Sequence, residues 1–201
     1  MKAKIPMLLI YSRLVMGILI VLLSIWPVGN FPIIATVLLT AGLLSDVFDG
    51  IIARRLNVST QKLRRLDSSV DQVFFIGVAV ATYIHCPEFF KAHVAKLVIL
   101  LAAEALTYVV SFVKFRKEVA THSIGAKMWT LLLFGTLVQL IWQCDSHFLF
   151  ESCFWIGMLT RLEIVAIILT LRNWTNDVPS LYHAIRLRQG KSIKRNKLFN
   201  G

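Results

Sequence analysis

The stretch SDVFDGIIARRLNVSTQKLRRLDSSVDQVFF, residues 45–75, determines how the chain is organised, because it places four aspartates between two long apolar runs. The four are Asp46, Asp49, Asp67 and Asp71. The first two are three residues apart and the last two are four apart, so each pair shares one face of a helix. Two antiparallel helices joined by a loop would bring both pairs to one depth. The sequence therefore predicts that four carboxylates converge on one site.

The composition points to a chain that lies mostly in lipid. Of 201 residues, 57% are hydrophobic and 16% are charged, which is more apolar than a soluble domain. A helix crosses the hydrocarbon core with about 20 apolar residues. Stretches of suitable length and composition are expected to span the membrane at about residues 5–27, 31–50, 67–86, 93–113, 128–144 and 149–171. We therefore expect an all-α integral membrane protein with six spans in a single domain, residues 1–201.

The net charge of +11 indicates orientation in the membrane and no nucleic-acid partner. With the N-terminus inside, all but three of the 22 lysines and arginines fall on the inner side, and the exceptions are Lys91, Lys96 and Arg161. This asymmetry follows the positive-inside rule. It predicts that both termini and the 51–66 loop are cytoplasmic.

The basic segment 177–201 has two interpretations. It is either a solvated tail that sets the topology, or a segment that lies on the anionic membrane surface through Tyr182, Ile185 and Leu187. The three cysteines are near the outer ends of the expected spans. They are either small apolar residues, or Cys144 and Cys153 form a bridge.

The four aspartates suit a divalent cation site. Unpaired carboxylates would repel one another and resist desolvation, so either some are protonated or a cation lies among them. Hard oxygen ligands in this number suit Mg²⁺ or Mn²⁺, with room for two ions about 3.5–4 Å apart, as in many enzymes that transfer phosphoryl groups. The alternative is that the aspartates cap helices or pair with the neighbouring arginines. Two same-face pairs at matched depth favour the metal site.

Three residues that follow Asp49 suggest a place for a phosphate ligand. Gly50 and Ala53 are three residues apart and leave a groove without bulky side chains, which a ligand could approach closely. Arg54 comes next, and its guanidinium is suited to hold a phosphate oxygen.

These residues form a pattern that resembles a known family. The runs DVFDGIIAR (46–54) and DSSVD (67–71), separated by twelve residues, resemble the signature of the CDP-alcohol phosphatidyltransferases, D-x-x-D-G-x-x-A-R-x8-G-x3-D-x3-D. All signature positions except one match at the right spacing; Leu63 stands where the family has glycine. IPMLLIYSRL (5–14) resembles the N-terminal helix of the family. GAKMWT (125–130) is similar to the G-K-x-K-T segment of its phosphatidylglycerophosphate synthases.

The resemblance implies a six-helix membrane enzyme, usually a homodimer, that transfers a substituted phosphate from a CDP-linked donor to an alcohol and releases CMP. It implies that the donor is CDP-diacylglycerol, that the reaction belongs to phospholipid biosynthesis, and that the four aspartates bind Mg²⁺ or Mn²⁺. Asp71 would also take the proton of the acceptor hydroxyl, Arg54 would contact a donor phosphate, and Gly50 and Ala53 would line the nucleotide site. The expected setting is a bacterial inner membrane, with membrane lipids around the protein and the active site at the cytoplasmic face.

The acceptor alcohol is left open by departures from the family pattern. Phosphatidylglycerophosphate synthases have Arg-Glu in the fourth span, where this chain has Ala103 and Glu104, and Trp129 replaces the second lysine of G-K-x-K-T. These changes argue against glycerol 3-phosphate, which stays an alternative beside an inositol phosphate and other small polar alcohols. The candidate acceptor contacts are Lys127, Glu104 and Arg116.

Two other function classes compete with this interpretation. A UbiA-like prenyltransferase also uses aspartates and Mg²⁺, but it needs more spans, and Ser45 stands where its N-D-x-x-D pattern has asparagine. A divalent-cation transporter would use the aspartates as an ion site. Transport sites tend to lie near the midplane of the bilayer, whereas these aspartates are at the inner ends of their spans.

Overall fold

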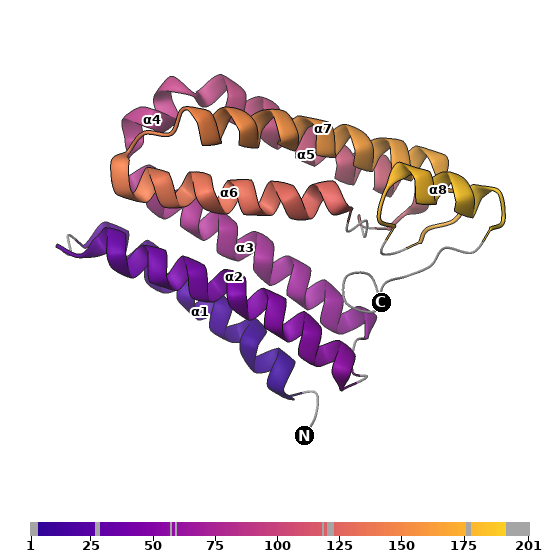
Figure 1. Cartoon of the computed structure of the whole chain (residues 1–201), viewed down its shortest axis with the longest axis horizontal. Helices are drawn as coiled ribbons and strands as arrows, with labels where there is room; N and C mark the ends of the chain where they lie inside the picture. Colours follow the sequence, from indigo (N-terminus) through magenta and orange to yellow (C-terminus); the bar gives the residue numbers. More distant parts are fainter. Residues whose placement is uncertain are drawn as a thin grey trace. The chain divides into compact units, whose positions relative to one another are not determined.

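The computed structural model describes residues 4–26, 29–56, 58, 60–117, 119, 123–175 and 178–191. All of its regular structure in these ranges is helical (Figure 1). The helices are α1 (Lys4–Ile25), α2 (Phe31–Arg55), α3 (Gln61–His85), α4 (Pro87–Ala92), α5 (Val94–Phe115), α6 (Ile124–Gln143), α7 (Phe148–Thr170) and α8 (Leu181–Arg188). The predicted all-α class is confirmed, while the short helices α4 and α8 were not predicted.

Within the described ranges, five helices are long and apolar enough to cross a membrane: α1, α2, α5, α6 and α7. Helix α3 has 25 residues, but charged residues crowd its first three turns. It therefore falls outside this apolar class, and the sixth span and the orientation of the termini stay predictions.

The predicted boundaries around the aspartates were wrong. We expected span two to end at residue 50 and a loop over 51–66, but α2 continues to Arg55 and α3 begins at Gln61. Helix α2 continues because Ala53 lies on its buried face, with 6% of its surface exposed. Helix α3 begins early because the Thr60 hydroxyl accepts a hydrogen bond from the backbone N–H of Leu63, at 3.2 Å. All four aspartates thus lie inside helices.

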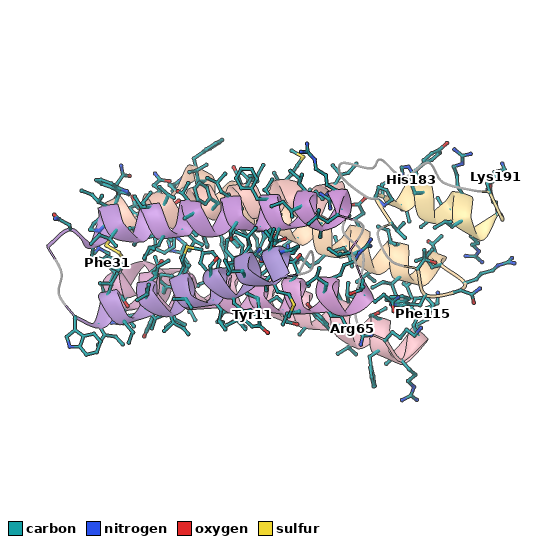
Figure 2. The ribbon with its side chains drawn as sticks, turned by 90° about the horizontal axis from the view of Figure 1, so that it is seen from below. Tyr11, Phe31, Arg65, Phe115, His183 and Lys191 are labelled. Atoms are coloured by element: carbon teal, nitrogen blue, oxygen red, sulfur yellow. A yellow bond between two sulfur atoms is a disulfide. The ribbon has the colours of Figure 1, made fainter. Side chains whose placement is uncertain are left out.

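The first compact unit contains residues 1–91 and 137–145, and in it α1 packs against both α2 and α3. The buried face of α2 repeats every three or four residues, with small side chains at several positions. Phe74 of α3 lies in the space that Gly17 and Gly42 leave open, and a Cβ added to Gly42 would lie 2.3 Å from Phe74 Cζ. Phe31 and Arg65 mark opposite ends of the unit (Figure 2). This packing fixes the register of α1 against α2 and α3, the two helices that carry the aspartates.

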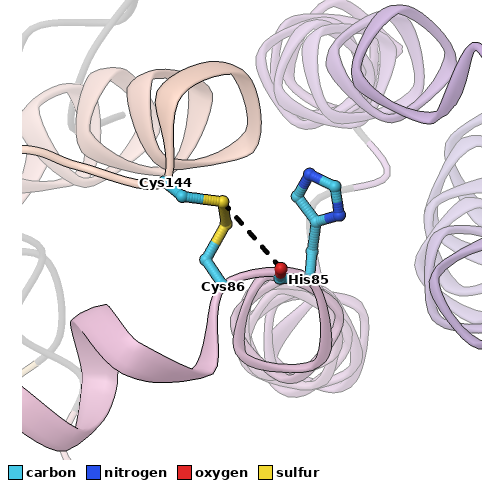
Figure 3. A group of neighbouring side chains, drawn as sticks. All are labelled: His85, Cys86 and Cys144. Atoms are coloured by element: carbon cyan, nitrogen blue, oxygen red, sulfur yellow. Dashed lines mark hydrogen bonds between the residues drawn. A yellow bond between two sulfur atoms is a disulfide. The ribbon is translucent and has the colours of Figure 1, made fainter.

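A disulfide closes the end of this unit away from the aspartates. Cys86 bonds to Cys144, with their Cα atoms 5.2 Å apart, next to His85 (Figure 3). The indole N–H of Trp142 donates to the Thr36 hydroxyl at 2.9 Å, which also joins the 137–145 segment to α2. The suggested Cys144–Cys153 bridge was wrong, because Cys153 is a buried free thiol on α7.

The second compact unit contains residues 92–136 and 146–201. Within it α7 packs against α5 and α8. An apolar cluster of Ile167, Leu171, Val178 and Ala184 holds α8 to the end of α7. The interpretation of 177–201 as a wholly solvated tail was therefore wrong for α8, while residues 192–201 lie outside the described part of the chain.

Candidate active site

The four aspartates surround a buried arginine that the sequence interpretation had assigned no role. Arg13 lies on α1, in line with Pro6, Ile10, Gly17 and Ile20, which are all buried. Only 1% of its surface is exposed. A buried guanidinium requires carboxylate or other acceptor partners, and this one has them on two neighbouring helices.

Arg13 contacts all four carboxylates. Its Nη1 lies 3.2 Å from Asp46 Oδ1 and 3.1 Å from Asp67 Oδ1, and it also pairs with Asp71. Its Nη2 donates to Asp49. The predicted convergence of the two aspartate pairs is therefore present in the structure.

Ser45 completes the set of Arg13 partners. Its hydroxyl accepts from Arg13 Nε at 3.3 Å and donates to the carbonyl oxygen of Gly42 at 2.9 Å. The guanidinium is thus fixed in orientation from three sides. Ser45 stands where the prenyltransferase pattern has asparagine, and in this structure it helps to orient Arg13.

The composition of the cluster bears on whether it suits metal ions. Arg13 contributes a single positive charge beside the four carboxylates that it contacts. Asp49 keeps 3% of its side chain exposed, whereas Asp46, Asp67 and Asp71 keep between 28% and 37%, so the cluster opens on one side. The Oδ1 of Asp71 is buried and is the atom that pairs with Arg13. Carboxylate oxygens of Asp46, Asp49 and Asp67 lie within 4.8 Å of one another, and an all-oxygen set of carboxylates fits hard divalent cations.

The residues expected at the donor lie beside this cluster on α2. A Cβ added to Gly50 would lie 3.3 Å from Nη1 of Arg54, so the arginine side chain covers the glycine. Ala53 is buried on the face that also carries Asp49. Leu63 is half-buried in the first turn of α3, so the departure from the family's glycine falls within a helix and not in a loop.

Comparison with known proteins decides the family. Residues 3–183 match the family model described as CDP-alcohol phosphatidyltransferase. The chain belongs to this family. No curated protein and no solved structure matches it.

Family membership establishes the general activity. CDP-alcohol phosphatidyltransferases are transferases of substituted phosphate groups, so the chain is an enzyme of this class. Its substrates are a CDP-alcohol and an alcohol acceptor in the membrane, and the family generally uses divalent metal ions. Together with the apolar helices, this identifies an integral membrane protein of phospholipid biosynthesis.

The candidate acceptor contacts of this phosphatidyltransferase lie in the second unit, and Glu104 already has a partner. Its carboxylate accepts a hydrogen bond from Arg161 Nε at 2.7 Å. The Arg161 guanidinium lies 3.7 Å from the ring centre of Trp129, and its Nη1 lies 3.3 Å from the Gly157 carbonyl oxygen. The indole N–H of Trp129 donates to the Cys153 carbonyl oxygen at 3.1 Å. The Trp129 that replaces a family lysine thus covers the buried guanidinium of this ion pair, while the Glu104 side chain stays partly exposed.

Of the other two candidates, Arg116 lies far from Glu104. Arg116 ends α5, twelve residues beyond Glu104, which is about 18 Å along the helix. Its guanidinium lies over the ring of Phe112, 5.7 Å from the ring centre. Lys127 is in the first turn of α6. Glu104 and Arg116 are therefore too far apart along α5 to bind the same small alcohol.

Sequence reasoning missed Arg13 and the Arg161–Trp129 contact. A signal for Arg13 was present, because it is a basic residue inside an apolar span and such residues usually face the interior of the bundle. Its spacing from Ile10 and Gly17 also places it on one helical face. The sequence contains no comparable local signal for Arg161 and Trp129, which are 32 positions apart.

Proposed function

We propose that Asp46, Asp49, Asp67 and Asp71 form the active site of a phosphatidyltransferase that uses CDP-diacylglycerol and a small polar alcohol. The observation that carries this proposal is the convergence of all four carboxylates on Arg13, at ion-pair distance. A structural role for each aspartate alone would not require them to meet. Family membership gives the chemistry that a site of this kind performs.

The four carboxylates would hold the metal ions, Mg²⁺ or Mn²⁺ and two in number. When bound, such ions supply the positive charge that neutralises the donor pyrophosphate and the departing CMP. Arg13 keeps the carboxylates of α2 and α3 together, because its two Nη atoms contact both helices. Arg13 also places a fixed positive charge next to the four carboxylates.

The transfer itself forms one bond and breaks one bond. The acceptor oxygen bonds to the phosphatidyl phosphorus, and the bond between this phosphorus and the bridging oxygen of the pyrophosphate breaks, so that CMP leaves with the electron pair. Asp71 takes the proton of the acceptor hydroxyl. Its side chain is 29% exposed and is thus within reach of a ligand.

The donor is oriented by residues at the end of α2. Arg54 holds a phosphate oxygen of the donor. Gly50 leaves room for the Arg54 guanidinium, because a Cβ at position 50 would crowd that side chain. The end of a membrane span is at headgroup depth, where the pyrophosphate of a lipid donor lies. A site at this depth favours CDP-diacylglycerol over a soluble CDP-alcohol.

The acceptor is a small polar alcohol, with glycerol 3-phosphate and an inositol phosphate as alternatives. The ion pair of Glu104 with Arg161 speaks against either residue as a contact for an acceptor phosphate, because each neutralises the other. A cytoplasmic position of the site, a bacterial inner membrane and a homodimer are retained as predictions. A divalent-cation transporter is disfavoured, because the whole family transfers phosphate groups.

The decisive experiment is a CMP-release assay. Purified protein in neutral detergent with Mg²⁺ and CDP-diacylglycerol is offered glycerol 3-phosphate, inositol phosphates, serine and other amino alcohols one at a time. We expect CMP release with one acceptor, and none after Asp71→Asn. Absence of CMP with every acceptor, from protein that elutes as a single species and unfolds cooperatively, would contradict the proposal.

A further inference from the structure

The second unit contains a basic cavity directly after the end of α7. It has a volume of about 520 Å³. Arg172, Asn173 and Thr175 line it from the turn that follows Thr170, and Arg188, Gln189 and Gly190 line it from the end of α8. We call it the α7–α8 cavity. Its polar lining consists of groups that bind oxygen anions.

The fold holds both walls of this cavity in place. Ala184 of α8 is completely buried in the cluster with Ile167, Leu171 and Val178, so α8 is fixed to the end of α7. The backbone N–H of Ile124 donates to the Pro179 carbonyl oxygen at 3.1 Å, which anchors the segment that leads into α8. The cavity is therefore framed by docked elements and not by a loose tail.

The end of α8 is also a closed turn. Gly190 has a φ of +76°, and its N–H donates to Leu187 O at 3.0 Å, while the N–H of Lys191 donates to Arg186 O at 3.0 Å. This is a helix end that needs glycine, because L-residues rarely adopt this φ. It fixes the backbone from which Arg188 and Gln189 project.

The charge around the cavity is positive and unbalanced. Of the described residues that line it, Arg172 and Arg188 are charged, and none is acidic. Lys114 already has hydrogen-bond partners at the end of α7, because its Nζ donates to the carbonyl oxygens of Ile168 and Leu169 at 2.9 and 2.7 Å. Within the described ranges, the side chains of Arg172 and Arg188 have neither a hydrogen bond nor an ion pair. Two such guanidinium groups that line one cavity are suited to bind an anionic ligand.

We propose that the α7–α8 cavity binds a phosphate group, held by Arg172 and Arg188. Helix α7 is apolar enough to span the membrane and ends at Thr170, so the cavity lies where phospholipid headgroups lie. Tyr182 and Ile185 of α8 are 64% and 43% exposed, as suits a helix at the lipid surface (His183 and Lys191 mark this region in Figure 2). The headgroup of an anionic phospholipid is the favoured source of the phosphate. This binding is separate from the transfer reaction.

The test measures retained lipid by native mass spectrometry of the full chain in neutral detergent. A chelator is present so that the aspartates hold no metal. One arm titrates phosphatidylglycerol against phosphatidylcholine, whose choline cancels the headgroup charge. The second arm adds inorganic phosphate as a soluble competitor. Arg172→Gln and Arg188→Gln are compared with Arg186→Gln, a matched control on α8 that does not line the cavity.

We expect phosphatidylglycerol to bind wild type in preference to phosphatidylcholine, and each cavity variant to bind it about tenfold more weakly. The Arg186→Gln control should stay within about twofold of wild type. Displacement by inorganic phosphate would show that a free phosphate suffices, and retention would show that the lipid body contributes. Equal losses in the control and the cavity variants would overturn the proposal in favour of diffuse surface charge, as would wild type that retains neither lipid nor phosphate. The measurement needs no turnover, so it is independent of the CMP-release assay.

Discussion

Arg13 Nη1 lies 3.1 Å from Asp67 Oδ1 and 3.2 Å from Asp46 Oδ1, and so one side chain of α1 links the two helices that carry the carboxylates. In phosphatidyltransferases of this family the same carboxylates are expected to bind metal. Arg13 and the proposed metal ions would therefore contribute positive charge to the same cluster. This gives two related predictions, one on the arginine and one on the metal.

Replacement of Arg13 by alanine should destabilise the protein strongly. Removal of one partner from a buried ion pair costs about 3–5 kcal/mol, because the remaining charges are left uncompensated. The melting temperature in detergent should fall by several degrees or more, and Mg²⁺ should restore more of it in the variant than in wild type. Lys91→Ala, which breaks an exposed pair with Glu88, is the control and should leave the melting temperature nearly unchanged. An Arg13→Ala protein as stable as this control would contradict the role of Arg13.

Divalent cations should stabilise the wild-type protein. A ligand that binds only the folded state raises the unfolding free energy by about 2.7 kcal/mol when its concentration is 100 times the dissociation constant. We expect Mg²⁺ to raise the melting temperature and a chelator to reverse the effect. Asp67→Asn should abolish this response. Asp145→Asn, which removes an exposed acid outside the cluster, should keep it. A Mg²⁺ response that survives in Asp67→Asn would place the metal elsewhere.

Much of this site could be predicted from the sequence. The contacts that could not be predicted have one common cause. The aspartate pairs follow helical spacing, so their convergence could be predicted from a local pattern. The partners of Arg13 are 32 to 58 residues away along the chain, and the disulfide joins cysteines 58 residues apart. Such pairings depend on which helix faces pack together. Helix α8 was missed for the same reason, because packing against Leu171 holds it in place. Residues 51–55 were assigned to a loop because the apolar run ends there, although packing of Ala53 continues the helix.

Gly42 should not tolerate a side chain. An added Cβ would lie 2.3 Å from Phe74 Cζ and within 2.9 Å of two more ring atoms, all of them deep in the three-helix packing. Overpacking of this kind typically costs about 1–3 kcal/mol. Gly42→Ala should therefore lower the melting temperature, and Phe74→Leu in the same chain should recover part of the loss. Gly29→Ala, where nothing lies within 4 Å, is the matched control. Equal melting temperatures for the two alanine variants would show that Phe74 does not occupy this space.

The disulfide between Cys86 and Cys144 should be detectable chemically and should stabilise the protein. A crosslink that closes a loop of 58 residues is worth about 4 kcal/mol in the chain-entropy description. Maleimide labelling after denaturation should find one thiol, Cys153, and three thiols after reduction. Cys86→Ser should then leave two reactive thiols and lower the melting temperature, whereas Cys153→Ser should leave the bridge intact. Three reactive thiols in unreduced protein would contradict the bridge.

The same bridge predicts the side of the membrane on which the aspartates lie. Disulfides persist in oxidising compartments. Cys86 follows Asp67 by nineteen residues along α3, which is about 28 Å and close to the thickness of the hydrocarbon core. The aspartates should therefore face the reducing, cytoplasmic side, in agreement with the positive-inside count. Single cysteines introduced at exposed positions, Ser68 at the aspartate end and Glu88 at the disulfide end, would test this in sealed membrane vesicles. A membrane-impermeant maleimide added outside right-side-out vesicles should label the cysteine at 88 and spare the one at 68, and the reverse pattern would invert the topology.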